Sequence, residues 1–87
     1  AVSLNPSSAF LLYDRANFHV ARKDFAHAIE DYTNAISIDP NLAEAYYNRG
    51  MTLLKSGDRK AGIADLSKAG ELGLFDAYSV IRRFSEK

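Results

Sequence analysis

The sequence repeats itself with a period of 34 residues. Residues 1–6 read AVSLNP, and residues 35–40, 34 positions later, read AISIDP. When the whole chain is compared with itself at this offset, the agreement continues well beyond the two hexapeptides. The identical pairs include Ala9 and Ala43, Tyr13 and Tyr47, Arg15 and Arg49, Asp24 and Asp58, Ile29 and Ile63, Asp31 and Asp65, and Ala35 and Ala69. A fixed self-similarity of this length is typical of a repeat architecture, in which one structural unit stacks on the next.

Each repeat unit contains two stretches in which apolar residues recur at the spacing of an α-helix. The predicted helices are Ser8–Arg22, Asp24–Ile38, about 42–55, about 58–71 and a last one at about 75–84. There is no strand signal of any length, so the sequence predicts an all-α fold. The loops within the units are only a few residues long, which favours antiparallel neighbouring helices.

Residues that cap helices mark the predicted boundaries. Short polar side chains directly ahead of a helix accept hydrogen bonds from its first backbone N–H groups, and glycine ends helices in the left-handed conformation. Gly57 is expected to end the third helix in this way, and Gly70 with Gly73 to form the exit from the fourth. The expected N-caps are Ser7 or Ser8, Asp24, Asn41 and Asp58.

These features resemble the tetratricopeptide repeat (TPR), whose 34-residue pattern runs W-x2-L-G-x2-Y, then A-x3-F, then P. With Ala9 as the first position, AEAYYNRG and AIEDYTNAISIDPN read as ordinary members of the family, and the resemblance covers essentially the whole chain. The sequence departs from the pattern at Arg15 and Arg49, which replace the usual Leu, and at His19, where Tyr is common. Small residues stand where the paired helices of each unit approach closely: Ala16 and Ala28, then Gly50 and Gly62.

The resemblance implies a right-handed α-solenoid. Its two complete repeats are expected at residues 7–41 and 42–74, followed by a capping helix at 75–87 that covers the apolar face of the last repeat. Residues 1–6 are expected to be the tail of the second helix of a preceding repeat. The chain is therefore expected to be part of a longer array.

Composition narrows the possible partners. Lys plus Arg and Asp plus Glu both number 11, so the formal net charge is zero, which argues against nucleic-acid binding. The absence of cysteine excludes disulfides and thiolate metal sites, and no apolar run approaches the ~20 residues of a membrane span. We expect a protein or peptide partner, with no nucleic acid, no membrane span and no cofactor; the sequence does not indicate the compartment.

No group of residues predicts catalysis or metal binding. His19 and His27 are eight residues apart across a helix break, so they do not form an i,i+4 metal-binding pair. We expect His19 at a packing position and His27 on the surface. Asp31 and Asp65 recur at one place in the two units, which suggests a repeat-specific surface or capping role. The sequence therefore predicts a protein that is not an enzyme and has no metal ligands.

The resemblance also assigns residues to a binding surface, because the first helix of each TPR pair lines a concave groove. Rings and a methionine there can bury side chains of an extended peptide, and amides can hydrogen-bond its backbone. The alternative is that Tyr13 and Tyr47 fill the seam between the repeats. The predicted peptide-binding residues are Phe10, Tyr13, Asn17, Tyr47, Asn48, Met51 and Arg83, with Val20 and Leu54 on the same side.

Some TPR domains bind a C-terminal carboxylate through Lys or Arg and Asn at set positions. Asn17 and Asn48 match the two asparagine positions, whereas Tyr13, Asp76 and Val80 stand at or near the basic ones. We therefore expect an interaction scaffold that binds an extended peptide segment, without a full carboxylate clamp. Two alternatives remain open: a homo-oligomer formed through residues 1–6 and, more remotely, an enzyme-associated domain.

Overall fold

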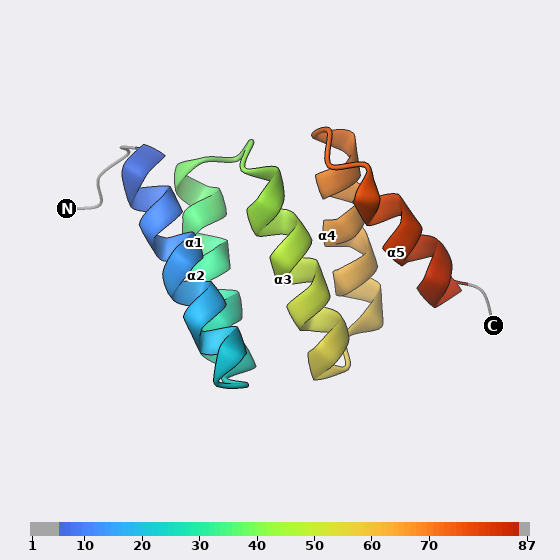
Figure 1. Cartoon of the computed structure of the whole chain (residues 1–87), viewed down its shortest axis with the longest axis horizontal. Helices are drawn as coiled ribbons and strands as arrows, with labels where there is room; N and C mark the ends of the chain where they lie inside the picture. The colour runs from blue at the N-terminus through green and yellow to red at the C-terminus, as the bar shows by residue number, and fades with distance from the viewer. Residues whose placement is uncertain (1–5, 86–87) are drawn as a thin grey trace.

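The computed structural model describes residues 6–85 as five α-helices joined by short loops (Figure 1). The helices are α1 (Pro6–Ala21), α2 (Phe25–Ile38), α3 (Ala43–Ser56), α4 (Arg59–Glu71) and α5 (Asp76–Ser85). Every predicted helix is present, with boundaries within two residues of those expected, and the described residues contain no strand. The all-α repeat fold is thus confirmed, while the expectation for residues 1–6 falls, apart from Pro6, outside the described residues.

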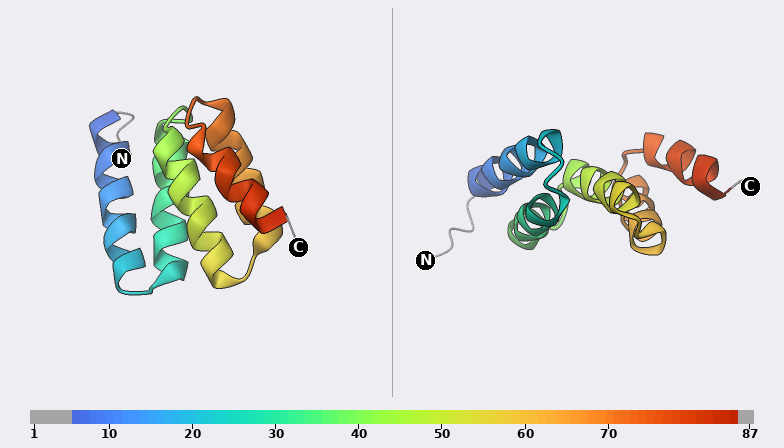
Figure 2. Two further views of the ribbon diagram at one scale, coloured as in Figure 1. Left: turned by 45° about the vertical axis from the view of Figure 1, so that its right-hand side comes forward. Right: turned by 90° about the horizontal axis from the view of Figure 1, so that it is seen from below.

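The helices form a row in the order of the sequence (Figures 1 and 2). Helices α1 and α2 make the first antiparallel pair and α3 and α4 the second; α2 packs against α3, and α5 packs against α4. The chain is elongated, with extents of 45 × 27 × 16 Å. Each element contacts its neighbours in the sequence, as expected for a quasi-one-dimensional repeat stack.

Three of the predicted boundary residues act as expected. The Asp24 side chain accepts a hydrogen bond from the backbone N–H of His27 at 3.4 Å, and the Asp58 side chain accepts one from the N–H of Ala61 at 3.3 Å. Gly57 follows α3 with a φ of 101°, in the left-handed region that costs glycine little. An aspartate at the equivalent position therefore caps the second helix of each repeat.

Two of the predicted N-caps are wrong. Ser7 and Ser8 lie within α1, which already includes Pro6; proline is tolerated in the first turn because its missing N–H has no intrahelical partner there. The N-cap of α3 is Leu42, without a side-chain cap, and in the preceding turn the backbone N–H of Asn41 donates to the Asp39 carboxylate at 3.2 Å.

Gly70 differs from the prediction as well. It lies inside α4 and is buried. A Cβ added at this position would overlap the ring of Tyr78 on α5. Gly73 alone takes a left-handed φ, of 113°, in the loop after α4. The capping helix therefore approaches α4 closely because position 70 has no Cβ.

The small residues of each repeat mark the closest approach of its two helices, as predicted. Ala16 and Ala28 are completely buried between α1 and α2. A Cβ added to Gly50 would lie 2.8 Å from the carbonyl oxygen of Gly62, and one added to Gly62 would lie 2.8 Å from that of Gly50. Real Cβ atoms do not approach backbone oxygen this closely, so α3 and α4 are in direct backbone contact.

Two apolar clusters form the core, one for each part of the row. The first centres on Tyr32 and joins α1, α2 and the start of α3 through Ala16, Ala28 and Ala45. The second centres on Leu66 and joins α3, α4 and α5. The seam between the clusters runs between α2 and α3.

An arginine–aspartate pair recurs inside both repeats. Arg15 on α1 donates to the Asp31 carboxylate on α2 from Nε at 2.7 Å and from Nη2 at 2.9 Å. Arg49 and Asp65 form the same two-pronged pair between α3 and α4, at 2.6 and 2.8 Å. The surface or capping role expected for the two aspartates is wrong, because both are buried beneath their arginines.

These pairs explain the departure from the usual Leu. A buried carboxylate needs a charged donor, and the planar guanidinium supplies two parallel hydrogen bonds. The hydrogen bonds from Arg15 lower the pKa of Asp31, and the hydrogen bonds to Asp65 raise the pKa of Arg49. Arginine and aspartate recur together in the second repeat, so the 34-residue period repeats the whole ion pair and not one residue of it.

Candidate functional site

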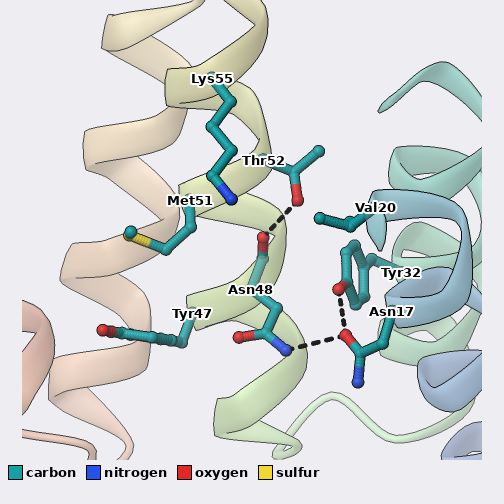
Figure 3. A pocket seen from close by; sticks show the side chains of 8 residues that line it. All are labelled: Asn17, Val20, Tyr32, Tyr47, Asn48, Met51, Thr52 and Lys55. Carbon is teal, nitrogen blue, oxygen red and sulfur yellow. Dashed lines mark hydrogen bonds between the residues drawn. The ribbon is translucent and has the colours of Figure 1, made fainter. Parts of the chain in front are cut away.

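A hollow of about 280 Å³ opens at the seam between the repeats (Figure 3). We call it the seam hollow. Helix α1 contributes Asn17 and Val20, α2 contributes Tyr32, and one face of α3 contributes the remaining five residues. The lining consists of Asn17, Val20, Tyr32, Tyr47, Asn48, Met51, Thr52 and Lys55. Four of the seven residues predicted for peptide binding thus lie together: Asn17, Tyr47, Asn48 and Met51.

A hydrogen-bond network fixes the polar wall of the seam hollow (Figure 3). The Tyr32 hydroxyl donates to Oδ1 of Asn17, and Nδ2 of Asn48 donates to the same oxygen at 2.9 Å. Asn48 Nδ2 also lies 3.0 Å from the hydroxyl oxygen of Tyr13. Burial raises the pKa of Tyr32 to about 12, so its hydroxyl remains a donor at physiological pH. The network ties α1, α2 and α3 together.

This network gives Asn48 a structural role besides its place in the lining. Its amide bridges α3 to α1. Within the described residues, Nδ2 of Asn17 and Oδ1 of Asn48 have no hydrogen-bond partner. One donor and one acceptor, both on side chains held in place, thus remain for a ligand.

Of the other predicted residues, Tyr13 lies at the seam, whereas Phe10 and Arg83 are exposed. Tyr13 packs against the first core cluster, while Tyr47 packs against the second and also lines the seam hollow. The alternative seam-filling role is therefore consistent with the position of both rings. Phe10 stacks on Tyr13 with 5.6 Å between ring centroids and is exposed. Arg83 is exposed on α5, which contributes nothing to the lining.

Sequence reasoning missed Tyr32, Thr52 and Lys55. The tyrosine belongs to a second helix, which the groove assignment did not include, and Thr52 is buried beside Asn48, to whose backbone carbonyl it donates at 2.7 Å. Lys55 is the one charged side chain in the lining, one helical turn beyond Met51. That i,i+4 spacing is the signal that could have identified it. Leu54, expected on this side, packs into the second core cluster instead.

The two histidines lie closer together than their separation in the sequence indicates. The hairpin between α1 and α2 brings the rings of His19 and His27 to 5.5 Å between centroids. His27 Nδ1 lies 2.7 Å from the Asp24 carboxylate, and this contact lowers the pKa of Asp24. His19 Nε2 lies 3.4 Å from the Asp31 carboxylate. Within the described residues, no three His, Cys, Asp or Glu side chains are arranged to hold a metal ion.

No helix in the described part of the chain is both long and apolar enough to cross a membrane.

Comparison with known proteins agrees with the repeat pattern and the paired helices. A family model described as TPR repeat matches residues 16–57, and one described as tetratricopeptide repeat matches residues 43–72. Together the two matches run from the buried small residue of α1 to the end of α4. They cover both turns marked by an aspartate cap and the Arg49–Asp65 pair, while Arg15 lies one residue before the first match.

Several curated proteins are similar to parts of the chain. The E3 ubiquitin-protein ligase CHIP of Arabidopsis thaliana is 33% identical over 84% of this chain and 26% of its own length. Tetratricopeptide repeat protein 36 of Xenopus tropicalis is 42% identical over 58% of this chain and 25% of its own. Human serine/threonine-protein phosphatase 5 is 29% identical over 75% of this chain and 13% of its own. The chain thus spans about a quarter of these relatives or less, and the likeness concerns the repeats: the chain belongs to the tetratricopeptide repeat family.

Proposed function

We propose that this chain binds an extended peptide segment of a partner protein in the seam hollow. TPR repeats generally mediate protein–protein interaction and are generally not catalytic. The observation that carries the finer proposal is the lining itself, in which two fixed amides lie beside Tyr47, Met51 and Lys55. An extended strand offers alternating backbone groups and side chains that match such a mixed surface.

The amides suit a peptide backbone. Oδ1 of Asn48 can accept from a peptide N–H, and Nδ2 of Asn17 can donate to a peptide carbonyl. Both side chains are already held by the network with Tyr13 and Tyr32. Little rotamer freedom is therefore lost on binding, which favours affinity.

The rest of the lining suits an apolar side chain beside an acidic one. Val20, Tyr47 and Met51 provide apolar surface, and methionine adapts its shape to different partners. The Lys55 ammonium can pair with a carboxylate at the edge of the hollow. With a net charge of zero, the chain offers no long-range attraction, so we expect only weak dependence of affinity on salt.

The affinity should be modest. Two repeats present a small surface, and interfaces that bury less than about 1,200 Å² are usually transient. We therefore expect selected peptides to dissociate rapidly from the isolated chain.

The proposal can be tested with a library of short unstructured peptides displayed on phage. Peptides selected on the parent chain are then titrated calorimetrically against Tyr47→Ala, Lys55→Glu and the matched control Lys68→Glu. Lys68 lies exposed on α4 and is absent from the lining, so its reversal repeats the charge change elsewhere.

We expect Tyr47→Ala to weaken binding at least about tenfold, because truncated aromatic anchors commonly cost more than the ~1.4 kcal/mol that a factor of ten represents. Lys55→Glu should weaken acidic peptides selectively, and Lys68→Glu should leave affinity unchanged. Peptides that bind both hollow variants as well as the parent chain, but lose affinity on Lys68→Glu, would place the working surface on the opposite face.

A further inference from the structure

The charged side chains are unevenly distributed along the helix axes, although the net charge of the chain is zero. The α1–α2 turn and the α3–α4 turn lie at the same edge of the row of helices (Figures 1 and 2). Five exposed basic side chains lie in or beside these turns, and we call them the basic edge: Arg22, Lys23, Lys55, Arg59 and Lys60. None of the five forms an ion pair within the described residues. Their charge is therefore available to a partner.

The two carboxylates at this edge are already engaged. Asp24 and Asp58 accept hydrogen bonds from backbone N–H groups at the starts of α2 and α4. Asp24 also lies 2.7 Å from the ring of His27. Two carboxylates against five basic groups leave the edge positive.

Local stability does not account for the basic residues. Arg59 and Lys60 are the first two residues of α4, where the partial positive charge of the helix end disfavours cations. Lys23 has a φ of 63°, in the left-handed region that favours glycine, and its counterpart in the second repeat is Gly57. These positions are unfavourable for basic side chains in the free chain, which is consistent with a role in binding an anion.

The opposite edge of the row carries the opposite charge. Asp39 lies in the α2–α3 loop, Glu44 lies in the first turn of α3, and Glu71 and Asp76 flank the α4–α5 loop. Residues 39–42 and 72–75, which form these loops, include no Lys or Arg. An anionic segment is therefore attracted to one edge and repelled from the other.

One face of α3 joins the two edges through the seam hollow. Glu44, Tyr47, Met51 and Lys55 are spaced i, i+3, i+7 and i+11, so they follow one another along this face. Figure 3 shows the last three in that order beside the hollow. Glu44 and Lys55 are both exposed. The hollow thus has a carboxylate beyond one end and opens at the other, past Lys55, onto the basic edge.

We propose that the bound peptide has acidic residues on one side of the part that enters the seam hollow, and that they lie along the basic edge. This inference rests on the proposed peptide binding and adds the chemistry and the direction of the peptide. Carboxylates that leave the hollow past Lys55 next meet Arg59 and Lys60, across the α3–α4 turn. At the other end they would face Glu44, so charge decides which end of the peptide lies at the edge.

Continuity at Lys55 favours an acidic protein segment over other polyanions. A single peptide can fill the hollow with its backbone and an apolar side chain and then place carboxylates on the basic edge. A nucleic acid or an anionic membrane has no peptide backbone for the amides of Asn17 and Asn48. For such a partner the edge provides electrostatic attraction alone.

The experiment adds a short run of glutamates to one end or the other of a core peptide selected on the parent chain, with serines as the control extension. Each peptide is titrated calorimetrically against the parent chain, the edge variant Arg59→Glu with Lys60→Glu, and the matched control Lys68→Glu with Arg82→Glu. The control residues are exposed on α4 and α5, outside the basic edge and the hollow. Glutamate suits the first turn of α4, so the melting temperature of the edge variant should not fall.

We expect glutamates at one end to strengthen binding about three- to tenfold, because exposed ion pairs each contribute little. The same glutamates at the other end should add nothing. The gain should disappear in the edge variant and at high salt, and persist in the control variant. The core peptide alone should bind all three chains equally, since none of the four substituted residues lines the hollow.

The outcomes separate this inference from the proposed function. If the core peptide depends on Tyr47 but glutamates strengthen it equally at both ends, at neither end, or still in the edge variant, this inference alone is overturned. A core peptide that binds Tyr47→Ala as well as the parent chain overturns both. Single-stranded DNA and vesicles containing phosphatidylserine are titrated in parallel. If either binds the parent chain and not the edge variant, while glutamates add nothing, the basic edge serves a different polyanion and the inference is wrong.

Discussion

Replacement of Gly50 by alanine should destabilise the chain, although alanine is the better helix former. Gly50 lies in α3 with helical geometry, so the substitution gains up to about 1 kcal/mol of helix propensity. The new Cβ would lie 2.8 Å from the carbonyl oxygen of Gly62, 3.0 Å from Leu66 Cγ and 3.1 Å from Asp65 Cβ. The nearest of these atoms belongs to the backbone of another helix and cannot rotate away.

The outcome depends on which effect is larger. Overpacking of this kind typically costs about 1–3 kcal/mol, and separating α3 from α4 would also disturb Asp65 beneath Arg49. The first repeat accommodates a Cβ at both equivalent positions, Ala16 and Ala28, so the fold itself permits a wider spacing. In the second repeat, however, Leu66 is completely buried at the present spacing of α3 and α4. We expect a net loss of about 1–2 kcal/mol.

Thermal and urea unfolding measure this loss. In a domain of this size, about 1 kcal/mol corresponds to roughly 4–8 °C in melting temperature. Ala64→Gly, at an exposed position of α4, isolates the propensity effect and should cost about 0.5–1 kcal/mol. If Gly50→Ala unfolds at or above the temperature of the parent chain, propensity outweighs the contact and the inferred backbone contact is wrong.

Three further predictions follow from burial, hydrogen bonding and charge. Ala28→Phe should lower the melting temperature far more than Ala26→Phe, because Ala28 is completely buried and Ala26 exposed; equal melting temperatures would contradict this. Asn48→Ala should cost about 1 kcal/mol or more in urea unfolding, since two partly buried hydrogen bonds are lost; an unchanged midpoint would show that the network contributes nothing. The lowered pKa of Asp31 stabilises the fold at pH values above about 4, its ordinary pKa, and this contribution is lost as pH falls through the lower folded-state pKa. The stability difference between the parent chain and Asp31→Asn should therefore shrink in acid, and a constant difference would exclude the Arg15 pairing as its source.

The fold was largely predictable because its determinants are local or periodic. The 34-residue echo and the helical spacing of apolar residues place all five helices, and Asp24 and Asp58 fix two of their starts. The misplaced caps have a local cause that the pattern does not contain. At Asn41, for example, the backbone N–H donates to the Asp39 carboxylate, and α3 begins two residues later without a side-chain cap.

The site was less predictable because it depends on side chains from three helices. Asn17, Asn48 and Met51 follow from their positions on α1 and α3, but their hydrogen bonds to one another do not. The pairing of Arg15 with Asp31 spans 16 residues across a hairpin, and no local rule joins two residues so far apart. Only the repetition of both residues in the second unit contains that information.

The position of the seam hollow would couple the proposed peptide binding to stability. Its polar wall is the network that joins the two repeats, so a peptide that binds Asn17 and Asn48 also bridges α1 and α3. Such a peptide binds the folded chain and not the unfolded one, so it must raise the free energy of unfolding, by about 2.7 kcal/mol at a concentration one hundred times its Kd. Because repeat stacks open at their interfaces between units, this gain should appear first as slower hydrogen exchange in the amides of α2 and α3. A ligand bound to one repeat alone would protect only that helix pair.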